Sequence, residues 1–498
     1  MATHKRTRTG CWTCREAGYK CDEKKPHCAR CIRLKITCKG YGVKLKWQDG
    51  NISTPVKRPR AKEKKSVHQV TSSSPVSIVS FASTPATFTS PSETTSSPES
   101  TRSLPLILFS PPQPSPNLSP TDRYLLHYWT TRLSTLISVT PRRHHSTPFQ
   151  QHLTAMLHDS ASLRSTILSM SANHLALSSH APSLRIHAYR HQQDAIQQLQ
   201  TLIQDPHHAA TEPALATVLM MQVSARLFAA DDDASAVNHL AGAQAMIARR
   251  GGVDESSSTR FLMSIFAYHD ILSSVSRGAP PLAVHSTFSL EDEAEMRGIA
   301  AILQLVARIS RLQHWIKARR GGSYDEPALT EEEDAEGRDI QDELLGMDTY
   351  LDGYGGANQD IAHTASAYRH AAHIYLHRTW LSIGAPHPIS VAHVTSCLTH
   401  LSHVPIASPL TSSHTWPLFT AGCEAIDPQQ RAFVKQRFAD MYQCKQFPSL
   451  RRVMRDVQDV WGAKDEVERK KREGVGEGMA RVDCIQVILR RGREVDLA

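Results

Sequence analysis

The chain has 498 residues, 40% of them hydrophobic, and a formal net charge of +9 at pH 7. This length suits one to three domains with a sizeable core, and no run of about 18 apolar residues occurs, which excludes a membrane-spanning protein. Residues 1–70 hold 19 lysines and arginines against five acidic residues, a net charge of +14, which leaves −5 for residues 71–498. A basic N-terminal segment followed by a mildly acidic remainder is typical of a nucleic-acid-binding module joined to a module that contacts other proteins.

Six cysteines near the N-terminus repeat one spacing, C-x2-C-x6-C, twice in succession. They are Cys11, Cys14, Cys21, Cys28, Cys31 and Cys38. Such pairs aim two thiolates at one tetrahedral metal ion, and soft thiolate ligands select zinc. The alternatives are a disulfide knot or scattered core cysteines. Both are disfavoured because Thr3–Gly10 is polar and basic, with no apolar segment of a secretory signal.

The number of thiolates predicts how they are shared. Two four-coordinate zinc ions need eight ligand positions, and six thiolates fill them only if two cysteines bridge both ions. The symmetry of the repeat predicts that the bridges are Cys11 and Cys28. One ion is then held by Cys11, Cys14, Cys21 and Cys28, and the other by Cys28, Cys31, Cys38 and Cys11. We therefore expect two Zn2+ ions per chain.

This cysteine segment resembles the fungal binuclear zinc cluster family of transcription regulators. The likeness to its arginine-metabolism-regulator-like members extends to the flanks G-C-W-T-C-R, K-C-D-E, P-H-C and C-K-G-Y-G-V-K-L-K-W. The resemblance implies a cluster that docks in the major groove of double-stranded DNA, commonly over a CGG-type triplet. Arg15 and Lys20 match basic positions of the family, which meet bases and phosphates. Ala17 and Gly18 stand where a basic pair is usual, so this chain departs from the family where the triplet is read.

Gly18 has two physical interpretations. It suits the C-terminal cap of a helix that starts after Cys11, which we favour, and it also lets backbone carbonyls approach the amino groups of cytosine. Base reading then depends on these carbonyls and on Arg15, Tyr19 and Lys20. Beyond the last cysteine, lysines alternate with apolar residues, which predicts an extended piece with its lysines facing phosphates. Those lysines are Lys44 and Lys46.

A dense basic run follows the cluster. It predicts a nuclear-import signal and hence a nuclear protein, and the alternative is a solvated run of charge. Its basic residues are Lys57, Arg58, Arg60, Lys62, Lys64 and Lys65. Of residues 71–120, 32 are Ser, Thr or Pro, too polar a composition to offset the entropy of ordering, so we expect disorder. No heptad run is visible, which leaves homodimer and heterodimer both open.

Helical periodicity begins at Ser119-Pro120 and continues. Further helices are predicted near 149–158, 160–178, 183–204, 212–230, 235–250 and 259–276. Because strand signals are nearly absent, the fold class is mostly α. We expect a zinc-stabilised binuclear cluster (1–50), a basic and then Ser/Thr/Pro-rich disordered linker (51–118), and a large all-α regulatory domain (119–498).

A second resemblance covers this helical part. The fungal-specific transcription factor domain is similar, from about residue 120 to 462, in the segments A-T-V-L-M-M-Q-V, H-L-A-G-A-Q-A-M-I-A-R-R-G-G, F-A-Y-H-D-I-L, Y-L-H-R-T-W and W-P-L-F-T-A-G-C-E-A-I. The resemblance implies a regulatory region that receives effectors, holds partners or masks an activation function. It carries over no catalytic residues.

Four histidines could indicate an enzyme. His363, His370, His373 and His377 are spaced so that several share one face of a predicted helix. Zinc hydrolases place a glutamate between such histidines, as in H-E-x-x-H, and none stands here. The chain holds 27 histidines, so we favour a packing role over a metal role. No phosphate-binding Gly-rich loop and no G-x-S-x-G motif occurs, and we predict that the chain is not an enzyme.

Two charged segments remain. Asp325–Asp352 carries twelve acidic residues and one arginine among apolar residues. Such mixing suits an activation segment that docks on a coactivator, but we favour a solvated loop between helices. Residues 463–478 are also expected to form a loop.

We conclude that the sequence predicts a nuclear, zinc-dependent, sequence-specific regulator of RNA polymerase II transcription. Its partners would be double-stranded DNA and transcription coregulators. The alternative is a zinc-cluster interaction protein, a transcriptional cofactor that does not read bases.

Overall fold

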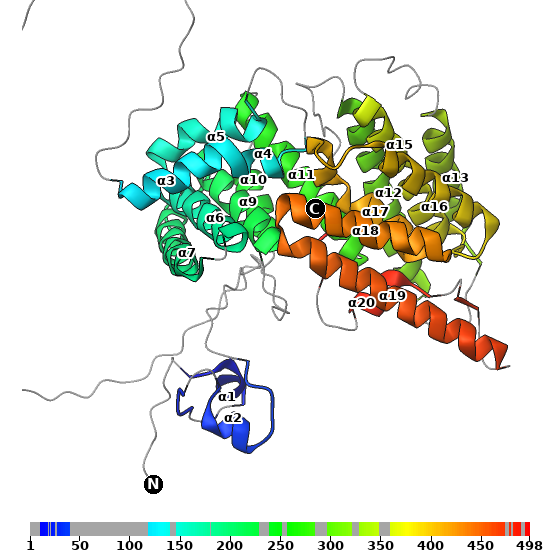
Figure 1. The fold of residues 1–498 in the computed structure, drawn as a ribbon, viewed down its shortest axis with the longest axis horizontal. Coiled ribbons are helices and arrows are strands. Elements are labelled where there is room, and N and C mark those ends of the chain that lie inside the picture. The colour runs from blue at the N-terminus through cyan, green and yellow to red at the C-terminus, as the bar shows by residue number, and fades with distance from the viewer. Residues whose placement is uncertain are drawn as a thin grey trace, which may run out of the picture. The chain divides into compact units, whose positions relative to one another are not determined.

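The computed structural model describes residues 10–17, 19, 21–24, 27–39, 118–139, 146–179, 181–228, 239–250, 256–283, 296–320, 328–347, 359–473, 478–479, 482–489 and 494–498. The chain divides into two compact units, residues 1–113 and 114–498 (Figure 1). The basic run from Lys57 to Lys65 and nearly all of the Ser/Thr/Pro-rich segment lie outside the described residues. The linker therefore stays a prediction.

Both units are helical, and the described residues contain no β-strand, which confirms the predicted fold class. The first unit has two short helices, α1 (Trp12–Glu16) and α2 (Ala29–Arg33). The helices of the second unit are α3 (Pro120–Tyr128), η1 (Trp129–Leu133), α4 (Ser134–Ile137), α5 (Pro148–Asp159), α6 (Ala161–Ser179), α7 (Pro182–Leu202), α8 (Pro206–Ala209), α9 (Glu212–Phe228), α10 (Leu240–Arg250), α11 (Ser257–Arg277), α12 (Arg297–Arg320), α13 (Glu331–Gly346), α15 (Gln359–Trp380), α16 (Pro388–His403), η3 (Pro409–Ser413), α17 (Thr415–Glu424), α18 (Pro428–Lys445), α19 (Pro448–Arg472) and α20 (Cys484–Leu489).

Several of these helices begin where a capping side chain precedes a proline. Ser119, Thr147 and Asp427 each accept a hydrogen bond from a backbone N–H of the first turn, and a proline follows each of them. Proline is favourable there because its missing N–H would have had no partner and its fixed φ suits a helix. Local capping chemistry therefore sets where these helices start. Within the described residues, the six helices predicted between 149 and 276 are confirmed, with ends shifted by a few residues.

Large side chains fill one extended core in the second unit. Trp129, Phe266, Tyr368, Trp416 and Phe419 are almost completely buried. Around them α6 packs against α7, α15 packs against α16, and α12 contacts α11, α13 and α15 (Figure 1). Within the described ranges, no helix is both long enough and apolar enough to cross a membrane.

The described middle of the acidic segment, Glu331–Gly346, is a packed helix, so the prediction of a solvated loop is wrong there. α13 starts at a capping box between Thr330 and Glu333, and its residues Ile340 and Leu344 are fully buried. Its acidic side chains meet arginines of α12, because Arg319 donates two bonds of 2.7 Å to Glu333. Composition alone suggested exposure, but cationic partners on the neighbouring helix neutralise this charge.

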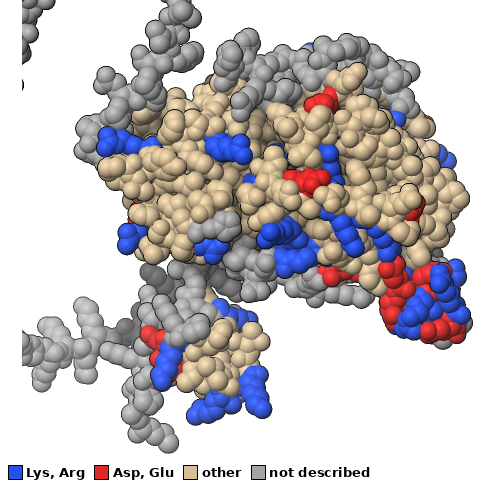
Figure 2. Space-filling view, in the orientation of Figure 1, with Lys and Arg blue, Asp and Glu red and all other residues tan. Residues whose placement is uncertain are grey.

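The expected loop over residues 463–478 is also wrong over most of its length. α19 continues to Arg472, and Figure 1 shows its end extending past the neighbouring helices. Ion pairs one helical turn apart support this exposed end, for example Arg469 with Glu473 at 2.5 Å and Lys470 with Glu466 at 3.3 Å. Figure 2 shows the interleaved acidic and basic side chains there.

Candidate metal centre

The two cysteine repeats fold in the same way. Cys11 and Cys28 are the N-cap residues of α1 and α2, and each sulfur accepts the backbone N–H of the cysteine three residues later. These N–H···S distances are both 3.4 Å, from Cys14 to Cys11 and from Cys31 to Cys28. A helix N-terminus stabilises a thiolate, because its free N–H groups point at the sulfur. The spacing C-x2-C is therefore the spacing of one capped first turn.

The six sulfurs form two overlapping groups. In one group the sulfurs of Cys11, Cys14, Cys21 and Cys28 all lie within 4.8 Å of one another, and in the other those of Cys11, Cys28, Cys31 and Cys38 do so. The Sγ atom of Cys28 is 3.6 Å from that of Cys11 and 3.7 Å from that of Cys14. Sulfurs that surround one zinc at about 2.3 Å in a tetrahedron are about 3.8 Å apart. The donor set therefore fits two zinc ions, with Cys11 and Cys28 common to both groups.

Burial determines the charge state of these thiols. Five of the six cysteines are buried and Cys38 is partly exposed. Burial raises the pKa of the Cys11 thiol and raises that of Cys28 to about 12. Without a cation these sulfurs would keep their protons, so binding of metal must release them. Arg30 adds positive charge at the rim, with Nη1 3.8 Å from the Cys14 sulfur.

A matching backbone turn ends each helix. The N–H of Ile36 donates to the carbonyl of Cys31 at 3.1 Å, and Lys35 between them has a left-handed φ of 51°. In the first repeat Tyr19 donates to Cys14 in the same way, at 2.9 Å. Gly18 occupies the corresponding place in the sequence and lies outside the described residues. A left-handed position after a helix favours glycine, and the cap at Gly18 stays a prediction.

Further residues join the two repeats, and the sequence reasoning missed them. The hydroxyl of Thr13 donates to the carbonyl of Thr37 and accepts the N–H of Lys39, both at 2.9 Å. Gly10 stands against Cys21, where an added Cβ would lie 2.7 Å from the cysteine Cβ. In the sequence, the small size of the residue directly before the first cysteine could have indicated this close approach.

The predicted DNA-contacting residues are only partly within the described chain. Arg15 is exposed and its guanidinium lies 4.2 Å from the ring centroid of Trp12. Tyr19 is 62% exposed, with the guanidinium of Arg30 4.0 Å from its ring centroid. Stacked rings and guanidiniums hold this basic and aromatic surface in place. Figure 2 shows basic side chains around this small unit. Lys20, Lys44 and Lys46, like the import run, lie outside the described residues.

Comparison with protein families covers both units. The model of the fungal Zn(2)-Cys(6) binuclear cluster domain matches residues 9–48, and that of the fungal specific transcription factor domain matches residues 124–497, well over half of the chain. The chain belongs to this fungal transcription factor family. The matched cluster domain is one that binds two zinc ions, as predicted. The family is one of transcription factors and not of enzymes.

Curated relatives match over short segments. Pestheic acid cluster transcriptional regulator 3 of Pestalotiopsis fici is 53% identical over 49 residues, which are 10% of this chain and 9% of the relative. Arginine metabolism regulation protein II of Saccharomyces cerevisiae is 52% identical over 42 residues, 8% of this chain and 5% of the relative. White-opaque regulator 2 of Candida albicans is 50% identical over 56 residues, 11% of each. The chain thus covers about a tenth or less of these relatives. No solved structure matches it significantly.

The histidines singled out in the sequence contact other histidines. His363, His370, His373 and His377 of α15 meet histidines of α16 ring to ring. Outside the two cysteine groups, the described residues contain no further set of three metal-binding side chains with ligand atoms within 4.8 Å of one another. The contacts are those of packed rings.

Proposed function

We propose that the chain is a nuclear regulator of RNA polymerase II transcription whose zinc cluster reads a defined DNA sequence in the major groove. The observation that carries this proposal is the pair of overlapping cysteine groups beside a surface of the exposed Arg15 and Tyr19 and the partly exposed Arg30. A metal-braced scaffold of this kind can hold cationic and aromatic groups rigidly against base edges and phosphates.

We assign the ligands as the sequence predicted. One zinc is held by Cys11, Cys14, Cys21 and Cys28, and the other by Cys28, Cys31, Cys38 and Cys11. We propose the predicted boundaries as well: 1–50 for the cluster, 51–118 for the linker and 119–498 for the regulatory domain. In the proposed complex Lys20, Lys44 and Lys46 add phosphate contacts, and the helical domain binds coregulators or a second subunit.

The test is selection of bound sequences from random duplex DNA by the zinc-loaded full chain, with a salt titration beside it. A specific regulator enriches a discrete motif and retains a large preference for it over unrelated DNA as salt rises. Binding without an enriched motif would contradict specific reading and would favour the cofactor alternative.

Nuclear import is proposed for the run from Lys57 to Lys65. Replacement of its six basic residues by glutamine in a fluorescent fusion of the full chain should move the protein out of the nucleus. Unchanged nuclear accumulation of that variant would contradict the assignment.

A further inference from the structure

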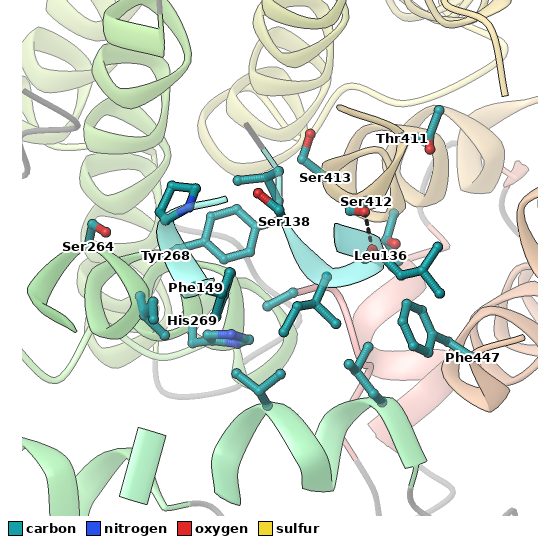
Figure 3. Close-up of a pocket in the computed structure, with 18 of the residues that line it drawn as sticks. Leu136, Ser138, Phe149, Ser264, Tyr268, His269, Thr411, Ser412, Ser413 and Phe447 are labelled. Carbon is teal, nitrogen blue, oxygen red and sulfur yellow. Dashed lines mark hydrogen bonds between the residues drawn. The ribbon is translucent and has the colours of Figure 1, made fainter. Parts of the chain in front are cut away.

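The helical unit contains a cavity of about 320 Å³ that the DNA-binding function does not use. Residues of α4, α5, α9, α11 and α12 line one part of it, and residues of η3, α18 and α19 line the rest (Figure 3). Segments from the beginning, middle and end of the unit therefore meet around one space. Ligand sites in proteins typically begin at about 300 Å³.

Most of the wall is apolar. Leu136, Phe149, Ile265, Leu303 and Phe447 border the space, and Figure 3 shows Phe149 and Phe447 on different sides of it. An engineered apolar cavity of about 150 Å³ holds benzene, so a space of this size holds a body of roughly two rings. Aromatic and aliphatic walls would bind such a body by excluding water from it.

One side of the cavity carries a buried cation. Lys445 is 4% exposed, and its Nζ donates to the hydroxyl of Ser412 at 2.7 Å and to the carbonyl of Leu136 at 3.5 Å. Both acceptors are neutral. Among the described residues, no aspartate or glutamate forms an ion pair with Lys445.

The charged side chains of the described lining are cationic. Arg260 and Lys445 belong to it, whereas no aspartate or glutamate of the described chain does. Burial lowers the pKa of Lys445 to about 8, so the amine still carries its proton at neutral pH. A buried ammonium held by neutral acceptors keeps much of its desolvation penalty, and an anion in the cavity would offset it.

A second polar side chain, that of His269, belongs to the lining and has one nitrogen without a hydrogen-bond partner in the protein. His269 is 7% exposed, and its Nδ1 is buried and makes no hydrogen bond. Its ring lies beside Tyr268 at the opposite side of the cavity from Ser412 in Figure 3. Buried polar atoms are nearly always hydrogen-bonded, so this nitrogen would gain a partner from a ligand group that reaches the ring.

We propose that this cavity binds a small organic acid with an apolar body of one or two rings, whose carboxylate pairs with Lys445. The body packs against Phe149, Leu303 and Phe447, and a polar substituent at its far end bonds to His269. The ligand thereby joins α4 and η3 to α18, which stabilises the helical unit.

The test uses the zinc-loaded full chain and two probes with the same body, 2-naphthoate and the neutral 2-naphthylmethanol. Titration calorimetry at neutral pH should show that naphthoate binds with a Kd below about 1 mM and at least about tenfold more tightly than the alcohol. Lys445→Met should abolish the preference for the acid. Lys435→Met, a change on the exposed side of the same helix, should leave it unchanged.

If Lys445 has only a structural role, the opposite result is expected for the Lys445→Met variant. If the lysine only joins Ser412 to Leu136, Lys445→Met lowers the thermal midpoint without ligand and leaves the preference for naphthoate intact. That result overturns the proposal. So does the absence of binding below about 1 mM by all of naphthoate, 4-phenylbutyrate and decanoate.

A second variant keeps the test decisive if Lys445→Met does not fold. Ser264 borders the cavity and is only partly buried, so Ser264→Trp places a ring into the space at small cost to the core. It should weaken acid and alcohol alike by at least about tenfold. Unchanged affinity for both would show that the probes bind elsewhere, which also overturns the proposal.

Discussion

His370 and His393 meet across the interface of α15 and α16, with their Nδ1 atoms 3.0 Å apart. Two turns away His363 and His400 repeat this contact at 3.1 Å. His393 also stacks on His373, with ring centroids 4.5 Å apart. Two imidazoles can share such a contact only when one nitrogen donates a proton and the other accepts it. Each of these pairs therefore requires that at least one of its two histidines is neutral, and double protonation would break the contact.

This requirement predicts that acid destabilises the helical unit. Burial, followed by the neighbouring histidines, lowers the pKa of His373 to about 2, and burial lowers that of His393 to about 4. The unfolded chain takes up these protons near pH 6.5, so stability is full above that pH and falls below it. At pH 5.5 each such histidine costs about 1.4 kcal/mol. Thermal unfolding followed by circular dichroism from pH 7.5 to about 5.5 measures this slope.

Substitution identifies the groups responsible. His373→Gln removes the most deeply buried ring of the interface, so it should flatten the dependence of the midpoint on pH. His158→Gln, at an exposed position of α5, should leave the dependence as it is. Equal slopes in the wild type and His373→Gln would show that acid acts elsewhere in the molecule.

Substitution of a buried carboxylate that lies between two cations should strongly destabilise the helical unit. Glu424 accepts bonds of 2.8 Å from Lys464 Nζ and from the backbone N–H of Ala385, and it also pairs with Arg378. Burial alone would raise its pKa, but Lys464 and Arg378 hold that pKa below its ordinary value. Glu424→Gln removes the buried negative charge that both cations contact, and we expect a loss of about 3–5 kcal/mol in the free energy of unfolding.

Urea unfolding measures that loss, and a matched surface pair provides its control. Asp465 pairs with Arg431 at 2.8 Å but is 57% exposed. Asp465→Asn should therefore cost no more than about 1 kcal/mol, because solvent screens an exposed pair. Similar losses in both variants would contradict the special role of Glu424.

Local signals account for what the sequence predicted well. Cysteine spacing, Ser-Pro and Asp-Pro caps and apolar periodicity act within one or two turns, so they predicted the cysteine groups and most helix ends. The predictions that were wrong concern segments whose contact partners lie far away in the sequence. α13 was taken for a loop because its acidic side chains find Arg308 and Arg319 only in the folded unit. The histidine partners on α16 and the cavity around Lys445 likewise arise from packing between helices, which no local pattern records.

The proposed bridging role of Cys11 and Cys28 predicts unequal effects of cysteine substitutions on metal content. Cys28 belongs to both cysteine groups, so Cys28→Ser should lose both zinc ions. Cys14 belongs to one group, and Cys14→Ser should retain more zinc than Cys28→Ser does. Cys444, which lies in α18 outside both groups, serves as the control, and Cys444→Ser should keep two ions. Atomic absorption on purified full chain measures the ratio. Full zinc content in Cys28→Ser would refute the bridging assignment.

The exposed basic surface of the cluster predicts how DNA affinity responds to salt. Arg15→Ala combined with Lys20→Ala removes two cations from the stretch assigned to DNA contact. We expect weaker binding, and the slope of log affinity against log salt should fall by about one for each phosphate that the variant no longer neutralises. Lys435→Ala, on the exposed side of α18, should change neither quantity. Fluorescence anisotropy with the selected duplex gives both. If the salt slope changes by less and the variant discriminates less between DNA sequences, then Arg15 or Lys20 contacts bases rather than phosphates. Unchanged affinity would place the DNA-binding site on another surface of the chain.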